Sequence, residues 1–274
     1  MGGVELKRVD GIAYREAVPE RDSGAAPALC LHGFPESSYM WRHVLEAVAQ
    51  AGRRAIAPDL PGFGDSPPDP PGTWERQVEA VERFRGALEL ERVALIVHDW
   101  GGIIGLRWAC DHPGVATALV LSNTGFFADG KWHAMARTMR TPSEGEQLVE
   151  AMTREGFGEM LTSLSRGLDE RAAEEYWKAF ETPEGRRGVL DLYRSGDFEK
   201  LDAYDGCLVS LEAPALVLWG GDDPFAPLAG AERFERELPG ANLVVVEGAG
   251  HFVYADEPER TAREVSDFLA DAGG

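Results

Sequence analysis

The segment Val93–Gly105 most limits what this chain can fold into. It begins as an apolar run rich in valine and isoleucine, which ends at His98, and glycines then open a helical pattern. A strand that turns directly into a helix needs small residues where the two elements press together, and it lifts one side chain out at the bend. That side chain is Asp99, whose carboxylate the dipole of the following helix would stabilise. The alternative interpretation is an ordinary helix-capping aspartate.

Short apolar strands alternate with amphipathic helices along most of the chain. The N-terminal residues suggest a hairpin that turns at Asp10-Gly11. Further apolar strands, with helices between them, are predicted at residues 28–31, 55–58, 93–98, 118–122, 215–219 and 243–246. This alternation predicts an α/β fold built on a mostly parallel, doubly wound sheet.

The alternation stops between Gly125 and about Cys207. Helical segments follow one another there without a convincing strand, and aromatic residues are scattered among them. We interpret residues 125–208 as a helical cap, or lid, domain that covers the crevice at the carboxyl ends of the strands, where such sheets bind ligands. Residues 1–124 and 209–274 would then form the core domain.

Residues with catalytic chemistry follow three of the predicted strands. Asp99 comes after one, an aspartate at 222 or 223 after another, and His251 after the last. A nucleophile needs a base, and that base needs a third group that fixes its orientation. The chain order of nucleophile, acid and histidine is the order found in α/β-hydrolases. We therefore expect these three side chains to form a catalytic triad at one edge of the sheet.

The chain resembles the α/β-hydrolase superfamily, in particular the aspartate-nucleophile branch that includes epoxide hydrolases and haloalkane dehalogenases. The resemblance covers nearly the whole chain and is carried by three segments, 32–35 (HGFP), 59–66 (DLPGFGDS) and 98–102 (HDWGG). The family register favours Asp223 as the acid. Some dehalogenases take the acid from the end of the strand after the elbow, but Asn123 stands there and cannot serve as an anion.

The resemblance implies a two-step hydrolysis. Asp99 would attack a saturated carbon and form an alkyl ester, which water activated by His251 would then hydrolyse. The backbone N–H groups of Phe34 and Trp100 would form the oxyanion hole. In the same loop, His32 and Gly33 would support the oxyanion hole from behind and Pro35 would stiffen the turn.

The leaving group separates the two enzyme hypotheses. An epoxide leaves as an alkoxide and needs an acid, whereas a halide needs N–H donors. Leu192-Tyr193-Arg194 resembles the segment that carries a ring-opening tyrosine in epoxide hydrolases, and Phe34 lacks the amide donor that many dehalogenases have at its position. We therefore predict an epoxide hydrolase, with haloalkane dehalogenase as the alternative. A non-enzymatic small-molecule receptor of the same fold is a more distant alternative.

The second leaving-group residue is open at this point. Epoxide hydrolases usually carry another tyrosine early in the cap, but residues 125–150 contain none. His133 and Tyr176 are candidates to replace it. Trp132 and Trp177 could donate to a halide, and all four residues could instead pack the cap.

Composition narrows the partners and the compartment. The net charge of −20 argues against nucleic acid or an anionic membrane as a partner. No apolar stretch has the length of a membrane span, and the N-terminus has no signal-peptide core. The three cysteines form neither a metal pattern nor an even disulfide set. We therefore expect a cytoplasmic monomer or homodimer, without metal or cofactor, that acts on a small to medium hydrophobic substrate with water.

Overall fold

The computed structural model describes residues 3–272 and contains a mixed sheet. Its eight strands run in the order β1-β2-β4-β3-β5-β6-β7-β8. β1 and β2 form an antiparallel hairpin, β2 also pairs antiparallel with β4, and all later pairings are parallel. The predicted α/β fold is therefore confirmed. The strands are β1 (Glu5–Val9), β2 (Ile12–Ala17), β3 (Ala28–Leu31), β4 (Ala55–Pro58), β5 (Val93–His98), β6 (Ala116–Ser122), β7 (Ala215–Gly220) and β8 (Asn242–Val246).

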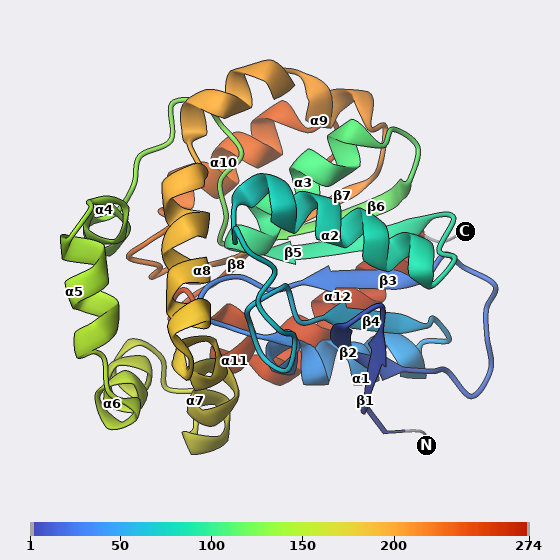
Figure 1. Ribbon diagram of the computed structural model, residues 1–274. Coiled ribbons are helices and arrows are strands. Elements are labelled where there is room, and N and C mark those ends of the chain that lie inside the picture. The colour runs from blue at the N-terminus through green and yellow to red at the C-terminus, as the bar shows by residue number, and fades with distance from the viewer. Residues whose placement is uncertain (1–2, 273–274) are drawn as a thin grey trace.

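Helices cover both faces of the sheet. In Figure 1, α1 and α12 lie below it, and α2, α3 and α10 lie above it. A short helix, α11, precedes α12 and was not predicted from the sequence, because four residues carry too little periodicity to detect. These helices are α1 (Arg42–Gln50), α2 (Trp74–Ala87), α3 (Trp100–Asp111), α10 (Leu228–Glu237), α11 (Val253–Asp256) and α12 (Pro258–Ala272).

Every element described between β6 and β7 is helical. Of these helices, α4 to α8 stand at the edge of the sheet toward which β3 points, with α8 beside α4 and α5, whereas α9 lies above the sheet next to α3 (Figure 1). They are α4 (Ala134–Arg140), α5 (Glu144–Ala151), α6 (Arg154–Leu164), α7 (Glu170–Trp177), η2 (Lys178–Phe180), α8 (Pro183–Ser195), η3 (Phe198–Tyr204) and α9 (Cys207–Ser210).

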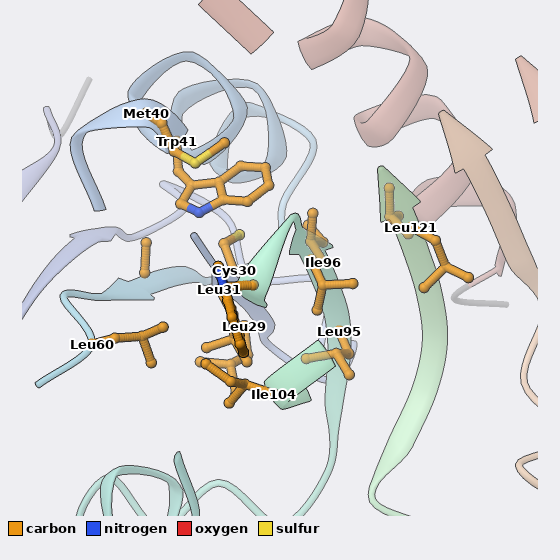
Figure 2. Packing of buried hydrophobic residues seen from close by; sticks show 14 of the residues in the cluster. Leu29, Cys30, Leu31, Met40, Trp41, Leu60, Leu95, Ile96, Ile104 and Leu121 are labelled. Carbon is orange, nitrogen blue, oxygen red and sulfur yellow. The ribbon is translucent and has the colours of Figure 1, made fainter. Parts of the chain in front are cut away.

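The residues of the two central strands, β3 and β5, are all buried. Figure 2 shows Trp41, from the short helix η1 (Ser38–Trp41), on one side of β3 and Ile104 of α3 on the other. Strands buried on both faces read as continuous apolar runs, which is why these two were easy to predict. The core thus holds the carboxyl ends of β3 and β5 rigidly side by side.

The cysteines differ from the prediction. Cys110 at the end of α3 and Cys207 at the start of α9 form a disulfide across 97 residues of sequence, and only Cys30 is free and buried. The prediction of no disulfide was wrong because the pairing depends on how the chain returns to α3, which spacing does not reveal. The cysteines therefore no longer support a reducing compartment. None of the described helices combines the length and apolarity that a membrane crossing requires.

Candidate active site

Asp99 occupies a strained turn between β5 and α3. Its backbone has φ 47° and ψ −123°, a conformation that residues with a side chain rarely adopt. The chain can turn this tightly because glycines, Gly33 and Gly101, stand where the neighbouring segments approach the turn. A Cβ on Gly101 would lie 2.2 Å from the carbonyl oxygen of Leu31, and one on Gly33 would lie 2.4 Å from the Cβ of Asp99. The predicted elbow is therefore present, and its glycines allow β3 and β5 to meet α3 closely.

The two oxygens of the Asp99 carboxylate have different surroundings. The backbone N–H of Phe34 donates to Oδ1 at 2.8 Å, whereas Oδ2 lies 3.5 Å from Nε2 of His251. Burial raises the pKa of Asp99, but the hydrogen bond and charge of His251 lower it by more, so the net pKa is below its usual value. The carboxylate is therefore ionised at neutral pH, with Oδ1 held by the N–H of Phe34 and Oδ2 facing His251.

His251 is held from its other side by Asp223. The ring donates from Nδ1 to Oδ2 of Asp223 at 2.7 Å, and the side chain of Asp223 is fully buried. The backbone N–H groups of Phe225 and Ala226 donate to Oδ1 of Asp223 at 2.7 and 3.0 Å. The family register favours Asp223 over Asp222 as the acid, and the structure brings residue 223 to the histidine. This arrangement fixes the tautomer and the orientation of the imidazole.

Asn123 contributes to the same cluster, although its sequence position suggested only that it could not act as the acid. Its side-chain amide donates to Oδ2 of Asp223 at 2.7 Å, and its Oδ1 accepts from the backbone N–H of Gly220 at 3.2 Å. Asn123 also has a positive φ of 44°, which favours asparagine. The end of β6 therefore positions Asp223, and this role could have been expected only from its place at a strand end.

Two carboxylates act on His251 in the free protein. Burial lowers the pKa of His251, but the charges and hydrogen bonds of Asp223 and Asp99 raise it by more, to well above its usual value. The imidazole is therefore protonated at neutral pH while both carboxylates are ionised. Any event that neutralises Asp99 removes one of these charges and lowers the pKa of His251.

A buried pair that sequence reasoning missed lies next to this cluster. Nε2 of His98 lies 3.3 Å from Oε2 of Glu36, and the rings of His98 and His251 are 4.9 Å apart. Burial raises the pKa of Glu36 to about 8. Burial and the charge of His251 lower the pKa of His98 to about 3. At neutral pH, Glu36 is therefore mostly protonated and His98 is neutral, so the pair adds no net charge beside His251.

The buried state of Glu36 gives a testable pH dependence. Because its pKa is higher in the folded protein than in the unfolded chain, ionisation of the unfolded chain destabilises the protein as pH rises from about 4.5 to about 8. Glu36→Gln removes this effect. We expect the variant to exceed the wild-type free energy of unfolding by on the order of 1–4 kcal/mol at pH 8, with the gain absent near pH 4.5.

Denaturant titrations at several pH values measure this difference. Glu91→Gln is the matched control, since Glu91 is exposed and should show no such pH-dependent gain. A constant difference between the Glu36→Gln variant and the wild type at all pH values would contradict a protonated Glu36.

The loop after β3 is tied to its surroundings through His32. His32 is buried and donates from Nδ1 to the carbonyl oxygen of Gly33 at 2.8 Å, while its Nε2 accepts from the backbone N–H of Leu60 at 2.9 Å. The peptide between Phe34 and Pro35 is cis. His32 therefore ties this loop to the one after β4. Trp100 begins α3, where backbone N–H groups have no partner within the helix.

Of the predicted cap residues, Tyr193 on α8 lies above the elbow. Its ring contacts those of Phe34 and Trp100 edge-on, at centroid distances of 5.2 and 5.1 Å, and its side chain is buried. Burial raises the pKa of Tyr193 well above its usual value, and the charge of Asp99 raises it further. The phenol is therefore protonated over the whole physiological range.

The other four cap residues divide into two pairs. Trp132 and His133 line a cavity together with Asp99 and His251, and this cavity has a volume of about 530 Å³. Tyr176, Trp177 and Tyr193 do not line it. Burial raises the pKa of Tyr176 well above its usual value, and the charge of Glu36 raises it further. Trp177 packs against the aromatic rings of Phe157 and Phe180.

The chain belongs to the α/β-hydrolase fold family, whose sequence profile matches residues 27–258. It is 31% identical to epoxide hydrolase 2 of Caenorhabditis elegans, over 84% of this chain and 70% of that protein. It is also 27% identical to a haloalkane dehalogenase of Mesorhizobium japonicum, over 91% of this chain and 86% of that one.

A solved haloalkane dehalogenase from Bradyrhizobium elkani superimposes with a TM-score of 0.83 at 26% identity, covering 98% of both chains. Within the family, the protein is thus a hydrolase of the branch that contains epoxide hydrolases and haloalkane dehalogenases.

Proposed function

We propose that this protein hydrolyses a hydrophobic epoxide to a vicinal diol through an ester on Asp99. The observation that carries the proposal is the position of Tyr193, a buried and protonated phenol packed against Phe34 and Trp100 above the nucleophile. Opening an epoxide produces an alkoxide, which needs such an acid. A halide needs no proton.

In the first step, Oδ2 of Asp99 attacks one carbon of the epoxide and the bond from that carbon to the ring oxygen breaks. Tyr193 gives its proton to the oxygen as the alkoxide forms. Oδ1 of Asp99, held by the N–H of Phe34, becomes the carbonyl oxygen of the ester. The free enzyme is prepared for this step because Asp99 is ionised and aligned.

In the second step, the ester changes the chemistry of His251. Asp99 has lost its charge, so the pKa of His251 falls. Its proton passes through solvent to the Tyr193 phenolate left by the first step, and the neutral imidazole can then take a proton from water. The resulting hydroxide attacks the ester carbonyl carbon, and the N–H groups of Phe34 and Trp100 stabilise the oxyanion. Collapse breaks the bond between the carbonyl carbon and the substrate oxygen, which takes the acid proton of Asp99. The diol is released, and the carboxylate of Asp99 and the protonated His251 are restored.

His133 is our candidate for the second ring-opening donor. Its Nδ1 accepts from the backbone N–H of Ala136 at 3.3 Å as the cap of α4, and burial lowers its pKa. A neutral His133 in this arrangement carries its proton on Nε2. Because His133 lines the cavity with Asp99, that proton is available to a substrate oxygen. In this proposal residues 125–208 act as the cap, which supplies both donors and excludes water.

Haloalkane dehalogenase activity is the second candidate, and one observation favours it. The indoles of Trp100 and Trp132 stack at 5.5 Å, and Nε1 of Trp132 is buried without a hydrogen-bond partner. Two indole N–H groups near a nucleophile can stabilise a departing halide. Assays on epoxides and on bromo- and chloroalkanes, with an Asp99→Ala blank, separate the two activities, since diol release supports our proposal and halide release alone contradicts it.

Tyr193→Phe should affect the two activities differently. Loss of the phenolic proton is expected to slow the epoxide alkylation step by about 100-fold or more, while halide displacement changes by less than about threefold. Rapid-mixing measurements of the alkylation step test this. Equal slowing with both substrate classes would make Tyr193 a packing residue.

A further inference from the structure

Two cavities meet beside the active site. The cavity that contains Asp99 adjoins a second one of about 610 Å³, which lies between the segment after β6, η3 and α10. Phe127, Asp129 and Arg233 line both cavities. These three residues therefore form a partition, with the active-site cavity on one side and the second cavity on the other.

Arg233 holds the partition together. Its guanidinium carbon lies 3.8 Å from the centre of the Phe127 ring, and its Nη1 lies 2.5 Å from Oδ1 of Asp129. Its Nε contacts Glu237 one turn further along α10, at 2.7 Å. Phe127 packs in turn on Phe234, at 4.7 Å between ring centres. One side chain thus joins the segment after β6 to α10.

The contacts that Arg233 makes across the partition, an ion pair and a cation–π contact, are weak. Asp129 is 76% exposed and Arg233 32% exposed, and ion pairs between exposed side chains are weak and screened by salt. A cation–π contact at such a site is also weak. Residues 124–133, which carry Phe127 and Asp129, contain no helix or strand. The partition can therefore open without disrupting any regular element.

We propose that Arg233 is a specificity-determining residue that gates passage between the two cavities. With Arg233 in place, the active-site cavity suits compact substrates. When its side chain swings away from Phe127 and Asp129, the two cavities join into one channel that admits long, uncharged substrates and releases their products. The expected changes in turnover rest on the proposed function, whereas the gate itself does not.

Variants with opposite expected effects test the gate. Arg233→Ala should raise kcat/KM for trans-stilbene oxide by about fivefold, with less than about a twofold change for styrene oxide. Phe127→Trp, which enlarges the partition, should lower kcat/KM for trans-stilbene oxide by a similar factor. Arg236→Ala, which removes an exposed arginine of the same helix, is the matched control and should change neither.

Salt supplies a further comparison. Raised ionic strength should favour trans-stilbene oxide in the wild type and have no such effect in Arg233→Ala. Equal changes for both substrates in the Arg233 and Phe127 variants, or an unchanged ratio between the substrates, would overturn the proposal.

A readout without turnover separates this inference from the proposed function. Trp100 and Trp132 line the active-site cavity, so acrylamide should quench the fluorescence of Arg233→Ala more strongly than that of the wild type. The extra quenching should disappear in a Trp132→Phe background if it arises there. Greater quenching without epoxide turnover would contradict the proposed function but support the gate. Unchanged quenching would contradict the gate.

Discussion

Replacing Asp99 by alanine is expected to abolish turnover while the protein stays folded. In the proposed reaction the ester forms on the Asp99 carboxylate oxygen that faces His251, so no ester can form without Asp99. Loss of a nucleophile of this kind costs roughly four to six orders of magnitude in rate. Steady-state assays, with circular dichroism and thermal unfolding on the same samples, measure both parts of this prediction.

Asp222→Ala is the matched control for this experiment. Asp222 is an exposed aspartate next to Asp223, and its removal should leave the rate within about threefold of the wild type. Turnover by Asp99→Ala above one-hundredth of the wild-type rate would mean that another group attacks the substrate.

His251→Gln is expected to trap the protein after a single alkylation. Asp99 and its Phe34 hydrogen bond stay in place, so the ester still forms, but no base activates water to hydrolyse it. We expect one burst of substrate consumption and then turnover about 100- to 10,000-fold below the wild-type rate. Mass spectrometry of the intact protein should show the mass of one added epoxide, on the peptide that contains Asp99.

The same residue predicts the acid limb of the pH profile. When ester hydrolysis limits kcat, activity should fall as His251 becomes protonated in the ester form. The pKa read from that profile should lie below the pKa of His251 in the free protein, because the ester has lost the charge of Asp99. A normal steady-state rate for His251→Gln, or a profile governed by the higher free-protein pKa, would contradict the assigned role of His251.

Local patterns were enough to predict the central part of the site. The turn at Asp99 depends on glycines close in sequence, and the ends of parallel strands must meet at one edge of the sheet, so Asp223 and His251 could be placed beside it. The family register then separated Asp223 from Asp222. The structure adds Phe34 to the same cluster through its N–H, as the loop sequence had suggested.

The buried partners of the site could not be predicted because they depend on packing between distant segments. Glu36 follows a loop motif and looks like a surface carboxylate in the sequence, yet it is 2% exposed against His98. Residues between β6 and β7 also differ in whether they reach the cavity. Trp132 and His133 reach the cavity, but the side chains of Tyr176 and Trp177 are directed by the phase of α7, which the sequence left open.

The most direct test of the account is a single turnover of an epoxide by excess enzyme in water enriched in the heavy isotope of oxygen. If Asp99 forms the ester, the new diol oxygen comes from its carboxylate, so the first diol released carries no heavy oxygen. The heavy isotope appears instead in the peptide that contains Asp99. Heavy oxygen in the first diol, with an unlabelled Asp99 peptide, would show direct attack by water and contradict the account.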